Sequence, residues 1–403
     1  MTDIINSLTS GPTELRDLRP DAKANAQKSF EALLELAEPG GFTQTERYAV
    51  AAYVAGLHGT ARATEFYADL LGDDAEPALA EAVAESIRRG RTRGPYGQFR
   101  EPELRDRSEQ GPQVSHAGLG LGERLTAAFD VAHLLVLHPR DSRPGVIRHL
   151  EPAGWTADEI VSLTQLIGFL CFQLRVIQGL DALAGAAPAE TPDTPTLPEL
   201  TWPDAPEPDI ARPRAFVNHA LGWKPWVAPV EKAELTEAQI DAMIQPRRVD
   251  MPYFRLLARD PDALRARTLT DLDIFYNTDG GLGRAERELA ATVTSVANGC
   301  VYCASVHAGR AEEESGRSED VNALIDTGVH TDLGSRQWNT LRDVALQLTA
   351  TPPRMGAGDV EKLSSAGFDA ASVIDVVNCV AFFSWANRLM LVLGEPELPR
   401  RFQ

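Results

Sequence analysis

The chain is poor in cysteine, in aromatic residues and in positive charge. Of its 403 residues, four are cysteines and 7% are aromatic. A framework of structural disulfides is therefore excluded, because disulfide-stabilised domains need far more cysteine per residue. Asp and Glu number 58 against 39 Lys and Arg, which leaves a formal net charge of −19. Such a field repels a phosphate backbone and an anionic membrane surface, so we expect no nucleic-acid partner and no membrane partner.

Targeting segments and long apolar runs are also scarce. The first twenty residues contain neither the basic segment nor the apolar segment of a secretory signal. The apolar stretch Val373 to Leu393 is interrupted by Asp375, Asn378, Asn387 and Arg388. A membrane-spanning helix needs about 20 predominantly apolar residues in a row, so we predict a buried helix here. We therefore expect a cytoplasmic protein, whose thiols are kept reduced.

Proline, by contrast, is concentrated in one segment. Eight prolines fall within residues 185–214. Because proline lacks the amide donor and fixes φ, neither a helix nor a central strand can run through this segment. The length of the chain suits two domains of roughly 150–200 residues each. We predict a first domain over 1–184, an extended linker over 185–214 and a second domain over 215–403.

The two sides of this linker resemble each other. Residues 45–67 align with residues 285–307 at an offset of 240, and a later segment from Asp130 aligns with one from Asp343 at an offset of 213. The matched pairs keep the same order in both halves and include Arg47 with Arg287, Gly59 with Gly299, Pro139 with Pro352 and Arg175 with Arg388. The sequence therefore predicts a duplicated domain. The fall in offset predicts an insertion in the first copy, which we place within residues 88–120.

Both copies have the pattern of helices. Leu289, Val293 and Val296 form one apolar stripe, and Asn298-Gly299 then ends the helix. Residues 336–350 and 370–393 predict two further helices. No stretch alternates between apolar and polar residues for long enough to form a sheet. The predicted fold class is all-α.

One short segment carries a set of residues with redox chemistry. Cys300 and Cys303 form a CxxC motif, His307 follows four residues after Cys303, and Glu288 precedes Cys300 by twelve residues. In a helix that begins near Cys300, Cys303 lies one turn in and His307 lies one turn further along the same face. A tight turn at residues 298–299 would fold the preceding helix back and bring Glu288 to the same place.

Each of these residue types has a part in peroxide chemistry. The thiolate is the nucleophile, and a helix N-terminus lowers the pKa of a thiol because the dipole stabilises negative charge. A Glu/His pair can take the proton from the thiol and pass it to a leaving oxygen. A second cysteine can then attack the sulfenic acid and close a disulfide. The set is what peroxide reduction requires, with no bound organic cofactor and no metal.

This segment resembles the redox motif of the alkylhydroperoxidase AhpD / carboxymuconolactone decarboxylase (CMD) family. The matching stretch is residues 283–316, GRAERELAATVTSVANGCVYCASVHAGRAEEESG, and the motif residues are Glu288, Cys300, Cys303 and His307. The resemblance implies that Cys303 attacks the peroxide and that Cys300 resolves and faces the reductant. Some family members carry a histidine between the two cysteines, where this chain has Tyr302.

The resemblance also implies an architecture and an activity. It implies two tandem AhpD-like helical domains and a thiol-dependent alkyl hydroperoxide reductase, with a hydroperoxide as substrate and a dithiol or protein as reductant. Family members assemble through helical faces, which implies a homo-oligomer here, a dimer or a trimer. At the 240 offset, the four motif positions of the first copy hold Tyr48, Thr60, Ala63 and Tyr67. The first domain is therefore expected to lack redox chemistry and to serve packing, oligomer geometry or substrate access.

Three other interpretations of the motif stay open at this point. The chain could be a CMD-like lyase, although such relatives typically lack the cysteine pair. It could be a non-catalytic redox switch or thiol-disulfide adaptor, in which the disulfide reshapes a surface for a partner. Cys300, Cys303 and His307 could also hold zinc, with Glu288 as the fourth ligand. Cys171 and Cys379 lie in apolar runs and are predicted to be inert core residues.

Overall fold

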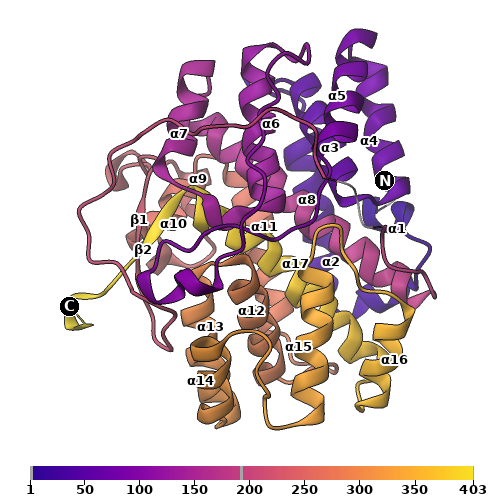
Figure 1. Cartoon of the computed structure of the whole chain (residues 1–403), viewed down its shortest axis with the longest axis vertical. Helices are drawn as coiled ribbons and strands as arrows, with labels where there is room; N and C mark the ends of the chain where they lie inside the picture. Colours follow the sequence, from indigo (N-terminus) through magenta and orange to yellow (C-terminus); the bar gives the residue numbers. More distant parts are fainter. Residues whose placement is uncertain (1–2, 191–193, 403) are drawn as a thin grey trace.

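The fold is built almost entirely from helices (Figure 1) in a computed structural model that describes residues 3–190 and 194–402. The first half contains α1 (Ile4–Leu8), α2 (Pro20–Leu34), α3 (Gln44–His58), α4 (Ala61–Asp74), α5 (Pro77–Gly90), α6 (Gly122–Leu137), α7 (Pro144–Leu150) and α8 (Ala157–Leu183). The second half contains α9 (Glu237–Ala242), α10 (Pro252–Leu257), α11 (Pro261–Tyr276), α12 (Arg284–Asn298), α13 (Val301–Ser315), α14 (Ser318–Thr327), α15 (Arg336–Thr349), α16 (Ala357–Ser365) and α17 (Ala370–Val392). The predicted all-α class is confirmed.

The structure also contains one small sheet that the sequence did not predict. Strand β1 (Gly222–Pro225) pairs antiparallel with β2 (Gly394–Glu397), with Trp223 opposite Pro396. Each strand has four residues, which is too short for an alternating pattern to be visible. The pairing ties the segment after the linker to the C-terminal end of α17.

Local signals in the sequence explain where the main helices begin and end. Helix α3 begins at a capping box, in which the Thr43 side chain accepts from the Glu46 amide and the Glu46 carboxylate accepts from the Thr43 amide. Helices α3 and α12 both end at a glycine in the left-handed region, Gly59 with φ 70° and Gly299 with φ 78°. A glycine adopts this conformation at little cost because it has no Cβ. The break predicted at residues 298–299 therefore lies where it was expected.

The helices of the two halves follow in the same order and at the same offsets as the sequence repeat. Helices α3 and α4 begin 240 residues before α12 and α13, and α7 and α8 begin 213 residues before α16 and α17. The extra length of the first half lies between α5 and α6, where residues 91–121 stand in place of residues 328–335 between α14 and α15. The structure thus has the longer connection inside the segment where the insertion was placed. The domain limits at residues 184 and 215 stay predictions.

Buried arginines repeat as well. Arg47 donates from Nε to the carbonyl of Phe42, at 2.9 Å, and Arg287 donates from Nε to the carbonyl of Leu282, also at 2.9 Å. Each of the two side chains therefore fixes the turn that leads into its own helix, α3 or α12, at the same point of the repeat. The two halves share hydrogen bonds as well as helix order.

The longest helices, α8 and α17, form the centre of the molecule (Figure 1). Both are long and apolar enough to cross a membrane. Within the fold, however, 94% of the most apolar stretch of α8 and 89% of that of α17 are buried. They approach closely at Gly168, where an added Cβ would lie 2.3 Å from the Trp385 ring. The prediction of a buried helix at residues 373–393 is confirmed, whereas the still more apolar helix α8 was missed.

Two buried arginines fasten the halves to each other. Arg175 of α8 donates to the carbonyls of Leu348, at 3.0 Å, and of Thr349, at 2.8 Å, which end α15 in the other half. Arg388 of α17 donates to the carbonyl of Val136, at 3.0 Å, near the end of α6 in the first half. The last carbonyls of a helix have no partner within it. Each arginine therefore supplies a hydrogen-bond donor to carbonyls near a helix end in the other half. The sequence alignment had paired these two arginines.

The described part of the proline-rich segment contains no helix and lies against both halves: in the second half, the amides of Ala357 and Leu398 donate to the carbonyls of Ala186, at 3.0 Å, and Ala211, at 2.7 Å. The backbone amide of Thr196 donates to the carbonyl of Arg89, at 2.9 Å, and the amide of Ser115 donates to the carbonyl of Pro198, at 2.8 Å. Residues 191–193 of the predicted linker lie outside the described residues. The remainder is held along the surface by hydrogen bonds, so it is a fixed strap.

Candidate active site

Helices α12 and α13 bring the four predicted site residues together. The two helices pack side by side and are joined at Gly299, so the end of one lies next to the beginning of the other. Cys300 is the N-cap of α13, Cys303 lies in its first turn, and His307 lies one turn further on. Glu288 of α12 faces His307 across the pair of helices and accepts a hydrogen bond from its Nδ1.

Glu288 is the buried anion of the site. One carboxylate oxygen accepts from His307, and the other accepts from Nε of Arg284, at 2.6 Å. Burial alone would raise the pKa of Glu288, but the charges and hydrogen bonds of His307 and Arg284 outweigh it and hold the pKa below its ordinary value. The carboxylate therefore stays ionised and fixes the ring of His307 through Nδ1, which leaves Nε2 as the nitrogen for proton transfer.

The two thiols differ in their ionisation. Burial raises the pKa of Cys303, but hydrogen bonds from Cys300 and Asn387 and the charges of His307 and Arg267 lower it by more, so the net pKa is below its ordinary value. Burial and the neighbouring Cys303 sulfur raise the pKa of Cys300 well above its ordinary value. Cys303 is thus the thiol that ionises, and it lies at a helix N-terminus that favours the anion.

The placement of Cys300 differs from the one that the family resemblance implied. Cys300 is only 1% exposed, so it does not face a reductant directly. Arg140 of the first half covers this turn: it donates to the carbonyl of Ala297, at 3.1 Å, and its side chain fills the space in which a Cβ on Gly299 would stand. The cover comes from residues about 160 positions away in sequence, which no local pattern could indicate.

Cys303 and His307 open onto a cavity of about 750 Å³. This volume is within the range of pockets that hold small organic ligands. Seven aromatic side chains give it an apolar wall, namely Tyr253, Phe254, Phe275, Tyr276, Tyr302, Phe382 and Phe383. The His307 ring meets the edge of Phe383 at a centroid distance of 4.3 Å. The Cys303 thiol and the His307 imidazole therefore face a cavity whose walls are largely aromatic.

Three further residues of this site were not predicted from the sequence. Arg267 and Asp271 project from α11, and Asn387 projects from α17. Helix α11 has a clear start signal, with Asp260 as the N-cap and Pro261 at the first position. Reading that helix would have placed Arg267 and Asp271 one turn apart on one face. Asn387 was noticed as an interruption of an apolar run, and a polar residue in a buried helix is itself a signal of function.

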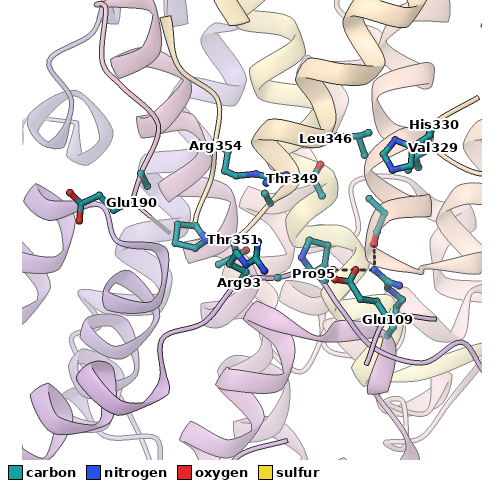
Figure 2. Close-up of a pocket in the computed structure, with 16 residues that line it drawn as sticks. Arg93, Pro95, Glu109, Glu190, Val329, His330, Leu346, Thr349, Thr351 and Arg354 are labelled. Carbon is teal, nitrogen blue, oxygen red and sulfur yellow. Dashed lines mark hydrogen bonds between the residues drawn. The ribbon is translucent and has the colours of Figure 1, made fainter. Parts of the chain in front are cut away.

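A second cavity, of about 280 Å³, lies between the two halves (Figure 2). Arg93, Glu109, His330 and Arg354 are among the residues around it. None of the residues that line it is a cysteine. This cavity therefore lacks the thiol that lines the cavity beside Cys303.

The zinc alternative has no supporting geometry in the described part of the chain. There, no group of three or more His, Cys, Asp and Glu side chains is arranged to hold a metal ion. Glu288, the fourth ligand of that alternative, already binds His307 and Arg284 with its two oxygens.

Comparison with known families agrees with the motif. Residues 261–345, from α11 into α15, match the model of the carboxymuconolactone decarboxylase (CMD) family. This segment, which contains Glu288, Cys300, Cys303 and His307, is a CMD-family domain. The resemblance inferred from the motif is thereby confirmed for this segment. A search of the curated proteins finds no match.

Several solved structures are similar to part of the chain. The AhpD core of an uncharacterized peroxidase-related protein from Ralstonia eutropha JMP134 is 23% identical, with a TM-score of 0.38, and the match covers 46% of this chain and 95% of that one. A peroxidase-related protein from Silicibacter sp. TM1040 is 26% identical, with a TM-score of 0.35, over 40% of this chain and 85% of that one. The debrominase Bmp8 is 16% identical, with a TM-score of 0.33, over 40% and 87%.

The lowered pKa of Cys303 gives a pH prediction. A His307→Gln variant loses the positive charge that favours the thiolate, so the pKa of Cys303 should rise. The rate of alkylation by iodoacetamide should then reach its half-maximum at a higher pH than in the parent, and the rate at neutral pH should fall. Both proteins would carry Cys300→Ser, so that Cys303 is the reactive thiol of the pair. An unchanged midpoint would show that His307 does not support the thiolate.

Proposed function

We propose that the chain is a thiol-dependent hydroperoxide reductase in which Cys303 attacks the peroxide. One observation carries the proposal: the thiol with the lowered pKa opens onto the cavity next to His307, and the thiol with the raised pKa lies one turn behind it. Such a divergence supports this assignment of the two roles, because the ionised sulfur is the better nucleophile and the neutral one can act as the resolving thiol. The CMD-family domain that contains both cysteines supports an enzyme of the AhpD-like class.

In the first step, the Cys303 thiolate attacks the terminal oxygen of the hydroperoxide. An S–O bond forms and the O–O bond breaks, so the sulfur is oxidised to the sulfenic acid and the peroxide is reduced to the alcohol. His307 gives its proton to the departing alkoxide from Nε2, and Glu288 stabilises the charged ring through Nδ1. Arg284 holds the other oxygen of Glu288 and acts as a positioning residue.

In the second step, the Cys300 sulfur attacks the sulfur of the sulfenic acid. The S–S bond forms, the S–O bond breaks, and water leaves with the thiol proton. A dithiol then reduces the disulfide by two exchange steps and is itself oxidised to a disulfide. Because Cys300 is covered and Cys303 faces the cavity, we propose that a small dithiol enters through the cavity and attacks Cys303.

The test is steady-state consumption of cumene hydroperoxide by the full chain with dithiothreitol as the reductant. We expect many turnovers per chain, with no consumption beyond one equivalent when the dithiol is left out. One oxidation per chain without turnover in the presence of dithiol would support the redox switch instead. A protein whose cysteines stay reduced, or which holds one equivalent of zinc, would overturn the proposal.

A further inference from the structure

The cavity beside Cys303 contains a buried arginine that forms no ion pair with a carboxylate among the described residues. Arg267 of α11 is only 5% exposed, and it lines the cavity together with Cys303 and His307. Its Nε has no hydrogen-bond partner among the described residues, and no ion pair joins its guanidinium to a carboxylate there. An unpaired buried charge is unfavourable unless something in the working protein pairs with it.

Aromatic rings hold the Arg267 guanidinium in place. It lies 4.9 Å from the ring centroid of Phe382, 5.8 Å from that of Tyr253 and 5.9 Å from that of Trp385. Such contacts stabilise a cation through the ring faces and leave its N–H groups available to an acceptor. A guanidinium presents its donors as a planar fork, which matches the two oxygens of a carboxylate.

The charge around the cavity is opposite to that of the whole chain. Five arginines line it, namely Arg247, Arg248, Arg267, Arg284 and Arg310, and among the described residues Asp271 is the one acidic residue in its wall. The chain as a whole carries a formal net charge of −19. A positive pocket in an acidic protein attracts anions to that place and away from the rest of the surface.

The acidic groups near the cavity do not cancel this charge. Glu288 is engaged with Arg284 and His307. Burial raises the pKa of Asp271, even though the charges of Arg267 and His307 act to lower it. Even with Asp271 ionised, the five arginines of the lining outnumber it.

We propose that this cavity binds organic hydroperoxides that carry a carboxylate, and that Arg267 is the residue that holds the carboxylate while Cys303 attacks the peroxide. The inference rests on the proposed function and names its substrate class. The aromatic wall takes the apolar body of the substrate, and the guanidinium takes the acid. Hydrogen peroxide, which has neither an apolar body nor a charge, would use none of these contacts.

The test compares two hydroperoxides that differ in one group, cumene hydroperoxide and its 4-carboxylate. The reduced enzyme is mixed with each in a single turnover without reductant, and oxidation is followed by counting free thiols. We expect the acid to react about tenfold faster or more at equal concentration, because a charge-assisted hydrogen bond favours it. Arg267→Met should bring the ratio of the two rates close to one.

Two further variants serve as controls. Arg265→Met removes an exposed arginine from the same helix, outside the cavity, and should leave the ratio as in the parent. Arg267→Lys keeps the charge and should retain part of the preference. Because the neutral hydroperoxide reports any effect of Arg267 on the thiol itself, the ratio isolates the carboxylate. Equal rates for the two hydroperoxides in the parent, or an equal loss of both in Arg267→Met, would overturn the proposal.

A binding measurement separates this proposal from the proposed function. The reduced enzyme is titrated calorimetrically with 4-isopropylbenzoate and with 4-isopropylbenzyl alcohol, neither of which can oxidise a thiol. We expect the acid to bind about tenfold tighter or more, and Arg267→Met to lose that difference. Preferential binding without oxidation by either hydroperoxide would keep the anion site and reject the peroxidase. Oxidation of the thiols with equal binding would reject the anion site and keep the peroxidase.

Discussion

Turnover of hydroperoxide is expected to disappear in a Cys303→Ser variant, with a loss of at least about a thousandfold. Serine cannot supply a thiolate, and the raised pKa and burial of Cys300 leave that sulfur neutral and away from the cavity. The Cys300→Ser variant should behave differently. It should keep one rapid oxidation per chain, which ends in a sulfenic acid at Cys303, because the attack needs only the first sulfur.

The two outcomes are measured by steady-state peroxide consumption and by mass spectrometry after trapping of the sulfenic acid. Cys171→Ala is the matched control, because it removes a thiol that is fully buried and outside the site. Its turnover should equal that of the parent. A single oxidation in Cys303→Ser together with none in Cys300→Ser would reverse the two roles. Full turnover in both variants would remove the cysteine pair from the mechanism.

An Arg175→Met variant should lose about 3–5 kcal/mol of unfolding free energy. Arg175 is fully buried and donates to the carbonyls of Leu348, Thr349 and Ala350 as well as to the hydroxyl of Thr351. Methionine fills much of the same space but leaves these acceptors without a partner in the interior. Burial lowers the pKa of Arg175 to about 9, so the guanidinium is still charged at neutral pH and its hydrogen bonds are charge-assisted.

Urea denaturation followed by circular dichroism measures this loss. Arg354→Met is the control, since Arg354 is exposed a few residues beyond the same helix end, and its effect should be within about 0.5 kcal/mol. Arg388→Met should cost less than Arg175→Met, because Arg388 donates across the halves only to Val136. Equal and small effects of all three variants would show that the hydrogen bonds of Arg175 and Arg388 between the halves contribute little to stability.

The parts of the fold that follow from the sequence are those written in local or repeated patterns. Gly59 and Gly299 end corresponding helices because each needs a positive φ, and that requirement is visible in one residue. The two offsets of the repeat are also the offsets of the helices. The CxxC motif with its distal histidine is local in the same way, so its residues could be named and their helix face assigned.

The parts that do not follow depend on contacts between distant segments. Arg175 and Arg388 were aligned with each other, yet their reach into opposite halves is a property of the packed helices. Arg267 and Asn387 come to Cys303 from helices 36 residues before it and 84 residues after it. The cover that Arg140 forms over the turn at Gly299 has the same origin. No pattern of spacing along the chain contains such information.

The contact of Arg140 with the turn before Cys300, made from the other half, has a consequence for how the protein responds to dilution. Copies carried on separate chains stay together only above their dissociation constant, and a cover formed between them is lost below it. Here the strap over residues 194–214 joins the halves, so each meets the other at an effective concentration set by the chain itself. Dilution, which separates the subunits of an ordinary oligomer, leaves Arg140 in place over the turn at Cys300.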